Sequence, residues 1–116
     1  MRLQSERDND ILSAVVDYCE RIEATYQRIG RSYECFREDP DFRDAFLMNI
    51  LQIGEAATRL SGECREELSD LPWSNIIGTR NVIVHGYVKV QNDVIWHIIE
   101  KDIPELKKHI KDSVGL

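Results

Sequence analysis

This sequence of 116 residues contains no apolar run that approaches the roughly 20 residues needed to span a membrane. Its N-terminus, MRLQSERDND, is polar and lacks the apolar core of a secretory signal peptide. No repeat, low-complexity segment or linker is visible, and the length is enough for one hydrophobic core. These absences predict a single cytoplasmic domain, residues 1–116, that does not enter a membrane.

Cysteine and histidine are too few and too scattered to predict a metal site. The three cysteines, Cys19, Cys35 and Cys64, are widely spaced, and no CxxC pair is present. This pattern disfavours a cysteine zinc site and favours free thiols, which fit a reducing compartment. His97 and His109 each stand alone, with no ligand partner at helical spacing. We therefore expect no bound metal and no cofactor.

An excess of basic residues is also missing. Lysine and arginine number 15 against 21 aspartate and glutamate residues, which gives a net charge of −6, and the isoelectric point is about 5.0. Generic nucleic-acid binders carry an excess of positive charge. Any nucleic-acid activity must therefore rest on a local basic pocket; otherwise the partner is of another kind.

Glycine and proline are scarce, with six and three residues, and strand-like alternation is nearly absent. Helical spacing of apolar residues dominates instead. The first predicted helix ends near Gly30 and carries one apolar stripe, formed by Ile11, Val15, Tyr18, Ile22, Tyr26 and Ile29.

A second long helix is predicted to begin at Asp39 and Pro40. Aspartate is a favoured N-cap, and proline is favoured at the first helical position. The helix ends around Ser61 and Gly62. Its apolar stripe consists of Phe42, Phe46, Ile50, Ile53, Ala57 and Leu60.

The second helix has features outside this stripe. The small residues Gly54, Ala56 and Ala57 would let a neighbouring helix approach closely. Asn49 lies close to this stripe. It is either a buried polar residue that hydrogen-bonds to the backbone or a residue that positions the side chain of Arg80. A second contact surface, such as one for another subunit, is predicted by three further apolar residues, Leu47, Met48 and Leu51.

Shorter helices are predicted for the rest of the chain. A polar helix, ECREEL, precedes a helix that opens at the LPW of residues 71–73 and reaches about His85, with Gly86 just past its end. Another helix starts at residue 92 or 93, and the DIP of residues 102–104 either kinks it or begins a last helix. The expected fold is all-α, a bundle of four main helices plus short helices.

The segment RNVIVHGY, residues 80–87, places polar side chains within an apolar run. On a helix, Arg80 interrupts the apolar face that also carries Ile83 and Tyr87. A buried guanidinium needs a partner or a solvent-filled pocket, because an unpaired buried charge is costly. Asn81 and His85 lie four residues apart on an adjacent face, so Asn81 could orient the imidazole.

These residues suit phosphate chemistry. Arg80 could bind a phosphate through two parallel hydrogen bonds. His85 ends its helix, where the dipole favours positive charge, and histidine can act as acid or base near neutral pH. Each residue also has a structural alternative: Arg80 could pair with an acidic residue, His85 could cap its helix and Tyr87 could be core. Spacing alone does not decide between these interpretations.

The same segment matches the Arg-x4-His-x-Tyr motif of the HepT-like toxins, a branch of the HEPN superfamily. The residue after the arginine is polar in that superfamily, often asparagine, and here it is Asn81. The segments NILQIGEAATRLS, LPWSNIIGTRN, VIW and DIPEL also resemble this family's pattern, so that the resemblance is strong over residues 40–106. This combination is more specific than the motif alone.

The resemblance implies an antiparallel HEPN-type bundle that forms homodimers. It also implies a metal-independent endoribonuclease that acts as the toxin of a type II toxin–antitoxin pair. His85 would then serve as acid and base on an RNA substrate, Arg80 would stabilise the phosphate, and Asn81 would support them. The implied antitoxin is a minimal nucleotidyltransferase that adenylylates Tyr87.

A second function is compatible with the same residues. The chain could be a non-catalytic α-helical subunit that binds a nucleotide or a partner nucleotidyltransferase without cutting RNA. The low isoelectric point favours this function slightly, whereas the intact Arg-Asn…His set favours the ribonuclease. Only a measurement of activity separates the two.

Overall fold

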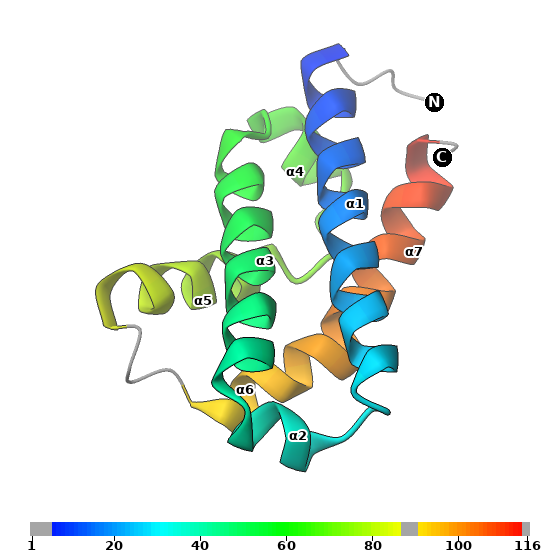
Figure 1. The fold of residues 1–116 in the computed structure, drawn as a ribbon. Coiled ribbons are helices and arrows are strands. Elements are labelled where there is room, and N and C mark those ends of the chain that lie inside the picture. Colours follow the sequence, from blue (N-terminus) through cyan, green and yellow to red (C-terminus); the bar gives the residue numbers. More distant parts are fainter. Residues whose placement is uncertain (1–5, 87–90, 115–116) are drawn as a thin grey trace.

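The computed structural model describes residues 6–86 and 91–114, and these residues form helices with no strand among them (Figure 1). The all-α prediction is therefore confirmed. The four longer helices are α1 (Glu6–Arg28), α3 (Pro40–Arg59), α5 (Trp73–Gly86) and α7 (Ile103–Val114). Three short helices and one π-helical turn lie between them: α2 (Tyr33–Glu38), α4 (Gly62–Glu67), α6 (Asn92–His97) and η2 (Ile98–Asp102).

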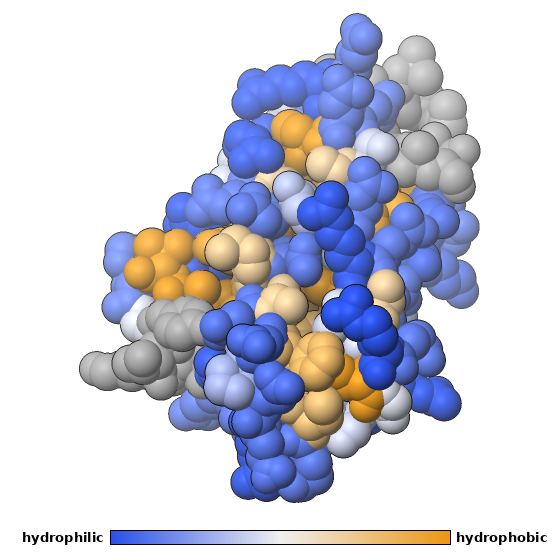
Figure 2. All heavy atoms as spheres, viewed as in Figure 1, coloured by the Kyte–Doolittle hydropathy of each residue, from blue (hydrophilic) through white to orange (hydrophobic). Residues whose placement is uncertain are grey.

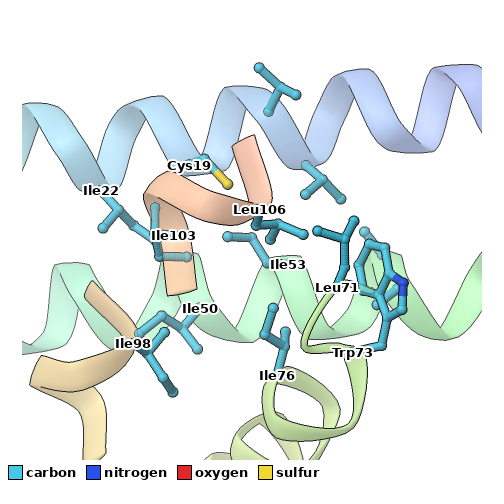
Figure 3. Close-up of a cluster of buried hydrophobic side chains, with 14 of the residues drawn as sticks. Cys19, Ile22, Ile50, Ile53, Leu71, Trp73, Ile76, Ile98, Ile103 and Leu106 are labelled. Carbon is cyan, nitrogen blue, oxygen red and sulfur yellow. The ribbon is translucent and has the colours of Figure 1, made fainter. Parts of the chain in front are cut away.

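Helix α3 is the centre of the bundle. It packs against α1 on one side and α5 on the other, and α7 packs against α1 (Figure 1). The predicted stripes supply the core, since Ile22 of α1 and Ile53 of α3 are fully buried. Figure 3 shows side chains from α1, α3, α5, η2 and α7 converging, among them Cys19, Ile50, Ile76, Ile98, Ile103 and Leu106.

Local cap chemistry sets the start of α3, as predicted. Asp39 is the N-cap, its side chain accepts a hydrogen bond from the Asp41 N–H at 2.9 Å, and Pro40 is the first helical residue. The other end of α3 is tied to α1. The buried carboxylate of Asp8 accepts hydrogen bonds from the Ser61 N–H at 2.9 Å and the Ser61 hydroxyl at 2.6 Å.

Helix α2 was not expected from the sequence. Its N-cap is Ser32, whose hydroxyl oxygen accepts a hydrogen bond from the Cys35 N–H at 3.1 Å. The fully buried Phe36 anchors it, with ring centroids 5.7 Å from Phe46 and 5.2 Å from Trp96. Six residues carry too little helical periodicity to be recognised, and α2 depends on this aromatic packing.

Residues 102–104 were predicted either to kink a helix or to begin a new one. The structure has one continuous helical run here, in which the pitch changes. The Ile103 N–H donates to the Ile98 carbonyl, five residues back, which closes the π-helical turn η2. Pro104 follows in the first turn of α7, where its missing N–H costs least. The hydroxyl of Tyr26 donates to the Glu100 carboxylate at 2.8 Å, so this turn is bonded to α1.

All three cysteines are free, as predicted, with Cys19 and Cys64 buried and Cys35 partly buried. Burial raises the pKa of Cys19 to about 12. None of the helices within residues 6–86 and 91–114 is long and apolar enough to cross a membrane.

Candidate functional site

Helix α5 has a buried beginning and an exposed end. Trp73 lies in the core, and its indole N–H donates to the Leu68 carbonyl at 2.9 Å. Beyond the buried Ile76 the helix crosses α3 and projects to the left of it in Figure 1, with Ile83 still buried. Its last turns expose most of their side chains, namely Asn81, Val82, Val84 and His85. Asn81 and His85, two polar residues of the RNVIVHGY segment, are therefore accessible.

A glycine sets how closely α3 and α5 approach. A Cβ atom built on Gly54 would lie 2.4 Å from the Arg80 Cβ and 3.3 Å from the Ile76 carbonyl oxygen. Real side chains do not approach so closely, and only glycine fits here without moving a helix. The prediction that Gly54 admits a neighbouring helix is confirmed, and the helix it admits is the one that carries Arg80.

This close approach places Arg80 beside an acidic residue of α3. Its Nε donates to the Glu55 Oε1 at 2.5 Å, and its Nη1 donates to the Asn81 Oδ1 at 2.6 Å. The Arg80 side chain remains 26% exposed. Two of its five N–H donors are thereby used, so the guanidinium is held in place and still faces solvent.

Sequence reasoning did not identify Glu55. It follows Gly54 directly, and a carboxylate next to the closest point of two helices is the signal that could have revealed it. The structural alternative for Arg80, an ion pair with an acidic residue, is thus present, and it coexists with partial exposure.

Asn81 bonds to Arg80, and no hydrogen bond joins it to His85 within the described residues. The structure therefore does not show Asn81 orienting the imidazole of His85. His85 is exposed in the last turn of α5, which includes Gly86 as its final residue, one position beyond the prediction. Tyr87 lies outside the described residues. Among those that are described, no three His, Cys, Asp or Glu side chains form a group that could hold a metal ion.

Asn49 takes the first of its two alternatives. Its side-chain N–H donates to the Ala45 carbonyl at 3.0 Å, one turn back in α3. It therefore satisfies the backbone and has no recorded bond to Arg80.

Apolar side chains surround the exposed end of α5. Leu47 and Ile83 are buried, but Met48 and Val84 are 55% and 49% exposed, and they line a hollow of about 320 Å³ between α3 and α5. On the other side of α5, Val82 is 47% exposed. Figure 2 shows hydrophobic residues at the surface over α5. Part of the second apolar surface predicted for α3 is therefore present, and this surface continues onto α5.

An all-α bundle that carries an Arg-x4-His pair on the exposed end of one helix defines the HEPN class of domain. The family model described as "Ribonuclease HepT-like" matches residues 15–113, and the chain belongs to this family. No solved structure gives a significant match to the chain.

Named relatives agree with this assignment. The chain is 42% identical over 83 residues to "Putative RNase TTE0752" of Caldanaerobacter subterraneus, covering 72% of this chain and 74% of that protein. It is 28% identical over 98 residues to "Probable ribonuclease HepT" of Thermococcus cleftensis, covering 84% of this chain and 87% of that protein.

Proposed function

We propose that this protein is a metal-independent endoribonuclease and the toxin of a type II toxin–antitoxin pair. The observation that carries the proposal is the way the Arg80 side chain is held and exposed. Glu55 and Asn81 hold its guanidinium in one orientation, partly exposed, on the same projecting helix as the exposed His85. Membership of a ribonuclease family supports RNA as the substrate.

The chemistry requires no metal. The 2′-hydroxyl oxygen of RNA attacks the adjacent phosphorus and its proton passes to a base; the bond from phosphorus to the 5′ oxygen breaks, and that oxygen takes a proton from an acid. The products are a 2′,3′-cyclic phosphate and a 5′-hydroxyl. Arg80 stabilises the charge that builds up on the phosphorane oxygens, using the N–H donors left free by Glu55 and Asn81.

A single His85 side chain cannot act as base and acid in the same step. A two-fold dimer built on the exposed ends of α5 would bring together two copies of His85 and Arg80. The exposed Met48, Val82 and Val84 support such a dimer, because apolar patches of this kind mark interfaces. The homodimer is part of the proposal.

The proposed control acts at Tyr87. A minimal nucleotidyltransferase antitoxin would transfer AMP from ATP to the tyrosine hydroxyl, releasing pyrophosphate. The added phosphodiester would place a negative charge seven residues after Arg80 in the chain and compete with RNA for the guanidinium.

One observation favours the second function, a non-catalytic partner of a nucleotidyltransferase. The charge of Arg80 is already balanced by Glu55, and the whole chain carries a net charge of −6. A site without surplus positive charge attracts RNA weakly.

The test is RNA cleavage in excess EDTA by three identically purified proteins: the parent, His85→Ala and His109→Ala. His109 is the matched control, since it lies on α7 and its ring nitrogen contacts the Glu105 carbonyl. Intact mass must first establish that Tyr87 is unmodified. Cleavage by the parent and His109→Ala, but not by His85→Ala, is the expected result.

Two other outcomes are informative. Equal cleavage by all three proteins would point to a contaminating nuclease. No cleavage by an unmodified parent, offered a mixture of cellular RNAs, would replace the ribonuclease with the non-catalytic partner.

A further inference from the structure

Helix α3 carries a second arginine near the one that Glu55 holds. Arg59 is the last residue of α3, and it is exposed. In the part of the chain that the structure describes, its guanidinium forms no ion pair and no hydrogen bond. All five of its N–H donors are therefore available to a ligand.

The position of Arg59 follows from that of Glu55. The two residues are four apart on α3, so they share one face and lie about 6 Å apart along the helix axis. The Cα–Cβ bonds of a helix tilt towards its N-terminus, which directs the Arg59 side chain back towards Glu55. Because Glu55 accepts a hydrogen bond from Arg80, the two arginines belong to one exposed surface.

Glu55 leaves the charge of Arg59 unbalanced. A glutamate four residues before an arginine has the spacing at which helices form ion pairs. The Glu55 carboxylate is bonded to Arg80 instead, on the neighbouring helix. Two positive side chains and one negative side chain thus lie together, which leaves one positive charge in excess. Arg59 supplies the local surplus of positive charge that Arg80 and Glu55 alone do not provide.

A purely structural role at the helix end is the alternative for Arg59. A cation in the last turn of a helix interacts favourably with the helix dipole. That interaction depends on the charge and uses none of the N–H donors. It predicts that removing the charge lowers the unfolding free energy and leaves RNA binding unchanged, so the two roles can be measured separately.

We propose that Arg59 binds a phosphate of the RNA backbone next to the phosphate held by Arg80. The inference rests on the proposed ribonuclease function and gives the RNA strand a path along α3. Neighbouring phosphates of a strand are one nucleotide apart, a separation that two long side chains one helical turn apart can match. A guanidinium suits this contact because it can donate two parallel hydrogen bonds to one phosphate.

The proposed dimer leaves this path open. Met48, part of the apolar surface assigned to the dimer, is 55% exposed and lies eleven residues before Arg59, about 16 Å along α3. The end of α3 that carries Arg59 adjoins α4, far from α2 (Figure 1). The apolar surface and the second phosphate site therefore occupy different halves of the helix.

The first experiment measures binding without catalysis. The probe is a fluorescent single-stranded RNA whose 2′-hydroxyls are all methylated, so that it cannot be cut, and its anisotropy is followed at several salt concentrations. Arg59→Gln should bind about tenfold more weakly than the parent at low salt. The slope of log K against log salt should become shallower by about 0.7, which is the loss of one phosphate contact on a single strand.

Two further variants serve as controls. Arg31→Gln removes the same charge from an exposed residue between α1 and α2, at the other end of α3 (Figure 1), and should bind as the parent does. Arg59→Lys keeps the charge and should keep the parent's salt slope. Circular dichroism establishes that each variant is folded, and intact mass that Tyr87 is unmodified.

The second experiment measures cleavage of unmethylated RNA. A phosphate beside the cleaved one is bound equally in the ground state and the transition state. Arg59→Gln should therefore raise KM about tenfold and leave kcat within about twofold of the parent. A lower kcat with an unchanged KM would overturn the assignment to a neighbouring phosphate.

The outcomes separate this inference from the ribonuclease itself. Weaker binding and a shallower slope for Arg59→Gln alone, without RNA cleavage by the parent, would retain the phosphate site and reject the ribonuclease. Cleavage by the parent with the same affinity and slope in Arg59→Gln would retain the ribonuclease and overturn the phosphate site. Equal weakening in Arg59→Gln and Arg31→Gln, or no binding of the methylated RNA by the parent, would also overturn it.

Discussion

Replacing Gly54 with alanine tests the claim that a close helix–helix contact positions Arg80. The new Cβ would lie 2.4 Å from the Arg80 Cβ, about 1 Å short of the ~3.5 Å at which two carbon atoms begin to make favourable contact. The Arg80 Cβ is fixed to the backbone of α5 and cannot swing away, so the two helices must separate.

Two opposing effects set the magnitude. Overpacking a tight contact costs about 1–3 kcal/mol of unfolding free energy, whereas alanine in place of glycine inside a helix stabilises it by about 1 kcal/mol. We therefore expect Gly54→Ala to be less stable than the parent by about 1 kcal/mol.

Gly78→Ala is the matched control. Gly78 lies in α5, and a Cβ there would meet no atom within 4 Å. This variant should gain stability through helix propensity alone, about 0.5–1 kcal/mol. The difference between the two variants isolates the packing cost.

Urea unfolding followed by circular dichroism measures that difference. At typical denaturant sensitivities, the unfolding midpoints of the two variants should differ by roughly 1 M urea. If Gly54→Ala proved as stable as Gly78→Ala, the contact between α3 and α5 would not be tight and the reasoning would fail.

Three further predictions concern titratable side chains. Glu55→Gln should change the unfolding free energy by less than about 1 kcal/mol, because the ion pair of Glu55 with Arg80 is partly exposed. It should lower kcat for RNA cleavage roughly tenfold, because the guanidinium would be misplaced, and an unchanged kcat would contradict a positioning role for Glu55. Because burial raises the pKa of the Cys19 thiol to about 12, iodoacetamide should label Cys35 first in the folded protein, and mass spectrometry of digested protein would reveal the reverse order. Burial raises the pKa of Asp102 above its ordinary 3.8, so the folded state holds this proton more tightly than the unfolded state does, and its stability falls as the pH rises above 3.8. Asp102→Asn should therefore have a larger unfolding free energy than the parent at neutral pH but not below pH 3.8. Equal stabilities of the two proteins at every pH would refute this.

Local features of the chain were predicted well because their physical causes are local. The start of α3 at Pro40, capped by Asp39, follows from the side chains of two adjacent residues. The end of α1 two residues before Gly30 follows from periodicity and a glycine with a φ of +65°. The position of His85 in the last turn of α5 belongs to the same group.

Features held by distant residues were missed. Helix α2 is stabilised by Phe36 against rings from α3 and α6, which six residues cannot reveal. The π-helical turn before Pro104 was also missed, because the sequence there was equally compatible with a simple kink. Sequence periodicity reports which face of a helix is apolar, but not which neighbour covers it.

The sequence by itself determined that Arg80, Asn81 and His85 share one helix and that the histidine ends it, since helical geometry follows from the chain within a few residues. Only the tertiary structure decided their partners. Glu55 reaches Arg80 because Gly54 lets two helices approach, and within the described residues the Asp102 Oδ2, at the end of η2, is buried without a hydrogen-bond partner. Both outcomes depend on how helices pack against one another, which no single stretch of sequence encodes.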